Sequence, residues 1–90
     1  MELKFEWDEE KRRKNLEKHL LDFIDARDLF HSLHIDLPSP YTKEKRLLAV
    51  GKLHEKMVTA VYTMRGEKIR IISFRSSRDE EKRKYRLLYE

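Results

Sequence analysis

Apolar and polar positions alternate over two neighbouring stretches in the C-terminal half of the chain. Residues 57–64 and 69–75 are rich in β-branched and aromatic side chains, which favour strands. Gly66 lies between them and can adopt the positive φ of a tight turn. The pattern predicts a β-hairpin, and we expect the rest of the chain to be arranged around it.

Strict alternation assigns side chains to the two faces of the second hairpin strand. Ile69, Ile71 and Arg75 are expected on one face, with Ile72 and Phe74 on the other. Both faces are partly apolar, which is typical of a strand covered on both sides. An unpaired buried guanidinium is costly, so the arginines of this strand must reach a carboxylate, solvent or an anionic ligand.

The N-terminal half predicts one short strand and two helices. Residues 3–7 alternate apolar and charged side chains, as a half-buried strand does. Asp8 and Asp22 are placed to cap helices over residues 9–19 and 23–30. The first helix is weakly apolar and is expected on the surface.

The remaining pattern completes a small α+β domain. Residues 31–37 could add a short edge strand, residues 39–42 predict a loop, and residues 46–53 predict the next strand. Ser77 begins a capping-box pattern for a helix that runs nearly to the end. We therefore expect one domain over residues 1–90, in the order β-α-α-β-β-β-α, with helices packed on a small, mostly antiparallel sheet.

Composition narrows the chemistry. The chain has no cysteine, so disulfides and thiolate metal sites are excluded, and a reducing cytoplasm is the expected location. The four histidines lack metal-ligand spacing and no glycine-rich phosphate loop occurs, so we expect no metal and no cofactor. No apolar run approaches the length of a membrane span, and no signal-peptide pattern begins the chain.

The positive charge is unevenly distributed. The net charge is +4, with 12 basic and 12 acidic residues over positions 1–64 and 9 basic and 5 acidic residues over positions 65–90. A polyanion such as RNA would therefore meet its attractive field in the last third of the chain.

A cationic and aromatic group gathers at the end of the predicted sheet and the start of the last helix. It includes five arginines with Glu81 and Tyr85, the arginines being Arg65, Arg70, Arg75, Arg78 and Arg83. Arginine forks bind phosphate oxygens in pairs and stabilise charge on a phosphoryl transition state. The alternative is purely structural: Glu81 pairs with Arg78 or Arg70, and Tyr85 packs the helix.

Three motifs carry a resemblance that spans nearly the whole chain. The first, F-x-W-D-x-x-K with N-x-x-K-H and a later Phe, is matched by Phe5, Trp7, Asp8, Lys11, Asn15, Lys18, His19 and Phe23. The second, E-x-R followed by Gly in a strand, is matched by Glu44, Arg46 and Gly51. The third is V-Y-T-x-R-G-x-x-I-R-I-I-S-x-R with E-x-x-x-Y, matched by Val61, Tyr62, Thr63, Arg65, Gly66, Ile69, Arg70, Ile71, Ile72, Ser73, Arg75, Glu81 and Tyr85. In these motifs the sequence resembles the BrnT family of toxins.

The resemblance implies a RelE-like fold and the toxin of a type II toxin–antitoxin system. Such a toxin would be a metal-independent endoribonuclease that inhibits translation by cutting RNA. The implied partners are RNA and a BrnA-like antitoxin, which binds the toxin and carries a DNA-binding domain. Operator DNA would be bound only through that complex, in which the toxin could also dimerise.

The resemblance also suggests roles for individual residues. Arg65, Arg70, Arg78 and Lys18 would hold the RNA, with Arg75 on the scissile phosphate. Proton transfer could fall to Tyr85, Glu81 or His19, and the sequence does not choose among them.

Departures from the family pattern favour a second hypothesis. Leu20 stands where the family usually has Gly, and residues 74–77 differ around the last strand arginine. The alternative function is therefore a non-catalytic module, a degenerate toxin that binds RNA, DNA or the antitoxin.

Overall fold

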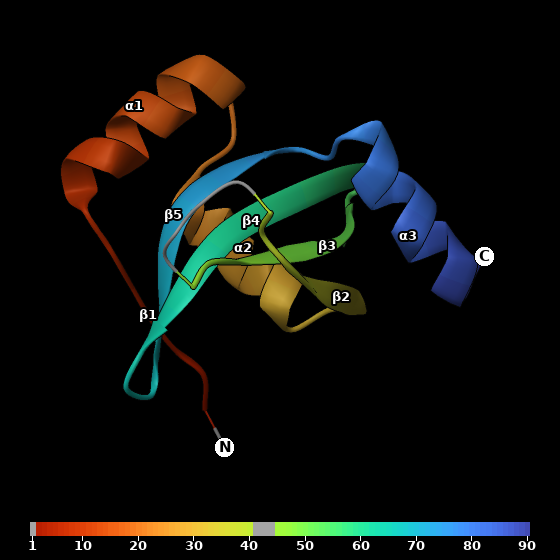
Figure 1. Ribbon diagram of the computed structural model, residues 1–90. Coiled ribbons are helices and arrows are strands. Elements are labelled where there is room, and N and C mark those ends of the chain that lie inside the picture. The colour runs from red at the N-terminus through yellow and green to blue at the C-terminus, as the bar shows by residue number, and fades with distance from the viewer. Residues whose placement is uncertain (1, 41–44) are drawn as a thin grey trace.

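The computed structural model describes residues 2–40 and 45–90, which form three helices and one five-stranded sheet (Figure 1). The elements are β1 (Lys4–Trp7), α1 (Glu9–His19), α2 (Phe23–Phe30), β2 (His34–Pro38), β3 (Leu47–Leu53), β4 (Lys56–Arg65), β5 (Lys68–Ser76) and α3 (Asp79–Tyr89). Both N-terminal helices have the predicted bounds. Part of the predicted loop, Tyr41 and Thr42, and the motif residue Glu44 lie outside the described residues.

The strands lie in the order β1-β5-β4-β3-β2. β1 pairs with β5 in parallel, and the other three pairings are antiparallel. The predicted α+β class with a mostly antiparallel sheet is confirmed, and the optional edge strand forms as β2. The last residue of β2 is Pro38, which has no N–H to donate to a further ladder.

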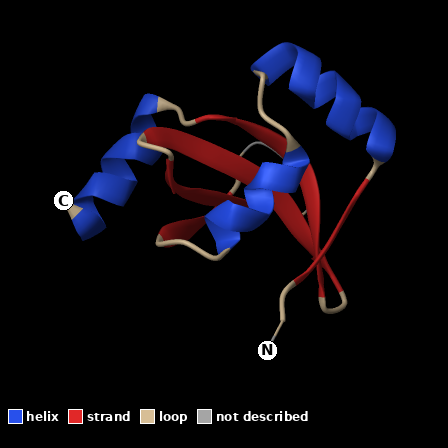
Figure 2. Cartoon of the chain, turned by 180° about the vertical axis from the view of Figure 1, so that it is seen from behind, coloured by secondary structure: helices blue, strands red, loops and turns tan. Residues whose placement is uncertain are grey.

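Helices pack against both faces of the sheet. On one face α2 buries Phe23, Ala26 and Leu29 against strand residues that include Ile71 and Phe74. Figure 2 shows α2 lying across this face. On the other face a smaller core forms around residues of β2, β3 and β4 together with the α3 ring, namely Ile35, Leu48, Val50, Met57 and Tyr85. The face under α3 is only partly covered, which leaves room for a groove.

A β-bulge in β5 reverses the predicted alternation. The register shifts between Val61 and Tyr62, which pair with Ser73 and Ile71, so Ile72 is the extra residue of β5. Phe74 therefore packs in the same core as Ile71 and is fully buried. The prediction that Arg75 shares a face with Ile69 and Ile71 is wrong, because the bulge turns Arg75 to the opposite face.

Local side-chain contacts fix the helix starts. The carboxylate of Asp8 accepts the Lys11 N–H at 3.0 Å, as the predicted N-cap should. Asp22 likewise accepts the Ile24 N–H at 3.1 Å. The predicted cap of the last helix is wrong by one residue, because α3 begins after Arg78 and not after Ser77.

Candidate functional site

A groove of about 300 Å³ lies on the half-open face of the sheet. It is bordered by the end of α1, by β3, β4 and β5, and by the residue that precedes α3. We call it the basic groove, and the residues that line it are Lys18, His19, Ser39, Arg46, Leu48, Val61, Ile72, Ser73, Arg75 and Arg78. None of these described lining residues is acidic, so the groove is suited to a polyanion.

The bulge in β5 builds one wall of the basic groove. With Ile72 as the extra residue, Ile72, Ser73 and Arg75 all border the groove, while Ile71 and Phe74 stay in the core. A regular strand would have turned Ser73 and Arg75 into the α2 core instead. The bulge therefore brings a hydroxyl and a guanidinium to the open face.

Arg75 is held in a buried ion pair with Glu81. Its two terminal nitrogens donate to the two carboxylate oxygens of Glu81, each at 2.9 Å. The side chains of Arg75 and Glu81 are 12% and 7% exposed. The predicted alternative paired Glu81 with Arg78 or Arg70, but the side-chain partner in the structure is Arg75.

Glu81 is fixed by further hydrogen bonds. Its Oε1 also accepts the Thr59 hydroxyl at 2.8 Å and the Arg78 backbone N–H at 2.9 Å. Burial favours the neutral acid, but the bonds from Arg75, the Arg78 N–H and Thr59 outweigh it and lower the pKa of Glu81 to about 2. A carboxylate with so low a pKa is a weak proton acceptor at neutral pH.

His19 is the groove side chain best suited to accept a proton near neutral pH. Partial burial, the neighbouring Lys18 and the positive charge of Arg75 all lower its pKa below the ordinary 6.5. The imidazole is therefore mostly neutral at pH 7, when it can accept a proton.

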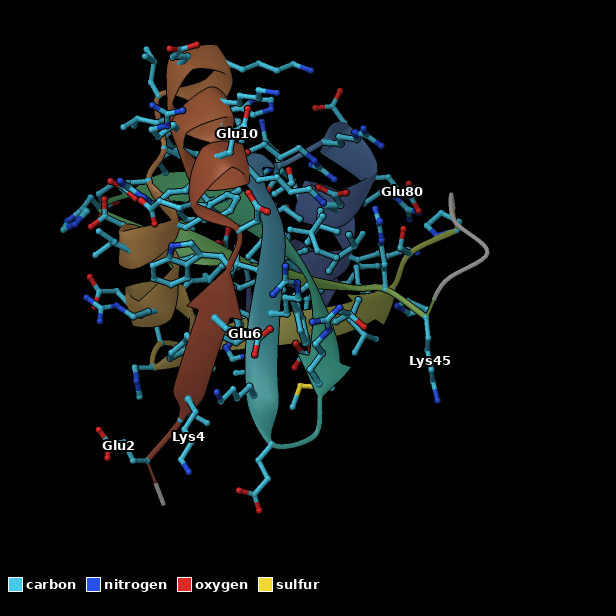
Figure 3. The ribbon with its side chains drawn as sticks, turned by 90° about the vertical axis from the view of Figure 1, so that its left-hand side faces the viewer. Glu2, Lys4, Glu6, Glu10, Lys45 and Glu80 are labelled. Atoms are coloured by element: carbon cyan, nitrogen blue, oxygen red, sulfur yellow. The ribbon has the colours of Figure 1, made fainter. Side chains whose placement is uncertain are left out.

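Two of the predicted RNA-binding arginines lie at another end of the sheet. Arg70 contacts the Glu6 carboxylate at 2.6 Å, and Arg65 lies 3.8 Å from the same carboxylate. In Figure 3, Glu6 on β1 lies across β5, while Glu80 at the start of α3 lies away from it on the right. Among the described groove residues, neither Arg65 nor Arg70 is present, whereas Lys18 and Arg78 are.

Tyr85 lies in the core under α3. It is 5% exposed, belongs to the core of Val50 and Met57, and packs against Tyr89 with ring centroids 5.1 Å apart. It does not line the basic groove as the described residues form it. The structure thus brings His19 and Arg75 together and leaves Tyr85 outside.

Metal ligands and membrane spans are not apparent in the described part of the chain. No group of three or more His, Asp or Glu side chains there is arranged to hold a metal ion. None of the helices in residues 2–40 and 45–90 is long and apolar enough to cross a membrane.

Among the polar residues that line the groove, Ser39, Arg46 and Ser73 are not among the predicted site residues. Arg46 and Ser73 both belong to the quoted motifs, yet charge and periodicity alone did not single them out. The signal that could have found them is their place in the motifs beside residues already considered functional.

Comparisons with known proteins agree with this architecture. The sequence model described as the ribonuclease toxin BrnT of type II toxin–antitoxin systems matches residues 7–81. Among solved structures, the chain is similar to the Brucella abortus ribonuclease toxin BrnT, with 33% identity and a TM-score of 0.71, over 87% of this chain and 100% of that one. The comparison with curated protein sequences gives no match. On the match to its family model and this structural similarity, the chain belongs to the BrnT family of ribonuclease toxins of type II toxin–antitoxin systems.

Proposed function

We propose that this chain is a metal-independent endoribonuclease that cuts RNA in the basic groove and so inhibits translation in the cytoplasm. The observation that carries the proposal is the pairing of a neutral imidazole, His19, with the fixed cation Arg75 on an open basic surface. Cleavage of RNA needs a proton acceptor for the 2′-hydroxyl and positive charge near the phosphate, and this pairing supplies both.

The reaction follows from these groups. His19 accepts the proton of the 2′-hydroxyl, whose oxygen attacks the adjacent phosphorus and forms the new P–O bond. Arg75, Arg78 and Arg46 stabilise the added negative charge of the pentavalent phosphate. The P–O5′ bond then breaks as the leaving 5′-oxygen takes up a proton from solvent water, and His19 releases the proton it accepted to solvent. The products are a 2′,3′-cyclic phosphate and a 5′-hydroxyl.

The three sequence candidates for proton transfer are not equivalent in this proposal. Glu81 serves as the anchor of Arg75, because its carboxylate is fully engaged and has a pKa of about 2. Tyr85 serves as a core residue of α3. His19 is the proton acceptor.

Metal independence is proposed on the chemistry of the lining. Divalent cations in RNA-cleaving sites are held mainly by carboxylate oxygens, and a groove lined by Lys18, Arg46, Arg75 and Arg78 repels them. The guanidinium groups take the charge-stabilising part that a metal would otherwise play. On the same ground, we propose that the chain is similar to RelE-like ribonuclease toxins.

The proposed partner is a BrnA-like antitoxin that binds the toxin directly. The family places the chain in a toxin–antitoxin system, which implies an antitoxin. We propose that operator DNA is bound only by the complex, in which the toxin could dimerise, because +4 is a modest charge for DNA binding.

The proposal is tested by RNA cleavage with purified protein in the presence of EDTA. Wild type is expected to cut, and His19→Ala is expected to lose roughly two to four orders of magnitude in rate. His54→Ala is the matched control, since His54 lies exposed in the β3–β4 turn. Loss of cleavage in EDTA with recovery on adding Mg²⁺ would contradict metal independence.

A non-catalytic binding module is the second candidate. The observation that favours it is the engagement of both terminal nitrogens of Arg75 by Glu81, which reduces the charge available to a phosphate. Induced expression in bacteria separates the two: the ribonuclease arrests growth and its His19→Ala variant does not, whereas a binding module affects growth equally with either side chain.

A further inference from the structure

Asn15 is a buried polar residue in a helix whose other residues are more exposed. It is 8% exposed, and its amide makes three hydrogen bonds to backbone groups. Nδ2 donates to the carbonyl oxygen of Phe74 at 2.8 Å and to that of Leu21 at 3.0 Å. Oδ1 accepts the Phe74 N–H at 3.1 Å.

These bonds continue the sheet where a strand is missing. β1 pairs with β5 only as far as Trp7 and Ile71, so the β5 edge at Phe74 has no strand beside it. The Asn15 amide donates to and accepts from Phe74, as a neighbouring strand residue would. An unpaired buried backbone N–H or carbonyl is costly, so this side chain fixes α1 to β5 at one point.

The anchored point is next to the groove-building bulge. Phe74 lies two residues after the extra residue Ile72 and directly before Arg75. On α1, Lys18 and His19 come three and four residues after Asn15, which places them on the same side of the helix. One side chain therefore joins the segment that carries His19 to the segment that carries Arg75.

We propose that Asn15 is a positioning residue: its amide clamps α1 onto the edge of β5 and thereby holds His19 in the basic groove beside Arg75. The consequence for catalysis rests on the proposed ribonuclease function. The clamp itself does not, because it predicts where His19 lies whether or not RNA is cut.

A second attachment of α1 supplies a matched control. Arg12 contacts both carboxylate oxygens of Asp22, at 3.2 and 3.0 Å, and so links α1 to the start of α2. Both side chains are about one-fifth exposed, at 21% and 23%. Arg12→Ala removes a tie from the same helix without touching β5 or the groove.

The test measures the pKa of His19 by NMR titration in three proteins: wild type, Asn15→Ala and Arg12→Ala. Without the clamp, His19 loses burial and its closeness to Arg75, so its pKa is expected to rise toward 6.5 in Asn15→Ala alone. With an RNA oligonucleotide, kcat is expected to fall roughly 10- to 100-fold, with a smaller change in KM. Arg12→Ala is expected to keep the wild-type His19 pKa and the wild-type kcat.

An unchanged His19 pKa in folded Asn15→Ala would overturn the proposal, as would an equal shift in Arg12→Ala. If Asn15→Ala does not fold, Asn15→Ser is measured instead, because a serine hydroxyl is too short to bridge both Phe74 groups. The titration also separates the two claims. A shifted pKa in a protein that never cuts RNA supports the clamp and contradicts the ribonuclease function, whereas an unshifted pKa in an active enzyme contradicts the clamp alone.

Discussion

Removing Arg75 should destabilise the protein strongly, contrary to the expectation for an exposed arginine. Arg75→Ala leaves the Glu81 carboxylate buried with its main cation gone. Burial raises the pKa of Glu81, and the bonds from Arg75, the Arg78 N–H and Thr59 together lower it to about 2, so Arg75 accounts for only part of that shift. Losing one partner of a buried ion pair costs about 3–5 kcal/mol, which is the loss expected for Arg75→Ala. For a chain of this size, each kcal/mol lowers the melting temperature by about 4–8 °C, so it should fall by roughly 12–40 °C.

The assay is thermal and urea unfolding at several pH values, with Arg83→Ala as control. Arg83 pairs with Glu80 at 2.6 Å on the surface of α3, where both side chains are more than half exposed, so its loss should cost under about 1 kcal/mol. Because the folded pKa of Glu81 is depressed, its stabilisation is present above about pH 4.5 and is lost as pH falls toward 2. Wild type should therefore lose more stability over that window than Arg75→Ala. An Arg75→Ala protein that melts like Arg83→Ala would refute the reasoning.

Three further substitutions have expected effects. Leu20→Gly should raise stability by about 0.5–1 kcal/mol in urea unfolding, because Leu20 caps α1 at φ 59 and is 82% exposed, so little packing is lost. Glu55→Gly should also raise stability, since Glu55 has φ 70 in the β3–β4 turn. A lower melting temperature would contradict the positive φ of Glu55. Glu6→Gln should tighten RNA binding about 2- to 5-fold at low salt by unpairing Arg70, as measured by fluorescence anisotropy. Unchanged affinity would place Arg70 outside the RNA surface.

Contacts within a few residues explain why much of the fold could be predicted. The caps at Asp8 and Asp22 act on N–H groups two or three residues away, so the local sequence contains both partners. The hairpin likewise follows from two β-branched runs around Gly66, which has φ 60.

The failures arise from contacts between distant segments. A bulge depends on how β4 and β5 pair, and period-two alternation along β5 contains no sign of the extra residue Ile72. The bulge turns Arg75 to the face where it pairs with Glu81, whereas the sequence alone predicts Arg78 or Arg70 as the partner of Glu81. The start of α3 differs from the prediction for a related reason. The Ser77 hydroxyl bonds to the Thr59 hydroxyl at 2.8 Å and does not cap the helix.

The candidate site, like the fold, could be predicted only where its residues lie close together in the sequence. Charge counting located the basic surface in the last third of the chain, but α1 contributes Lys18 and His19 to it from the N-terminal third. Only the packing of α1 on β5 brings those segments together. The role of Asn15 was invisible for the same reason, since its partner Phe74 lies 59 residues away.

The most direct test of the central claim is the chemistry of the RNA ends made by purified protein in EDTA. The account predicts cleavage that leaves a 2′,3′-cyclic phosphate and a 5′-hydroxyl, with an acidic limb of the pH–rate profile that follows the His19 pKa measured by NMR. Wild-type cleavage by His19→Ala, or products ending in a 5′-phosphate, would contradict attack by a 2′-hydroxyl that His19 deprotonates in the basic groove.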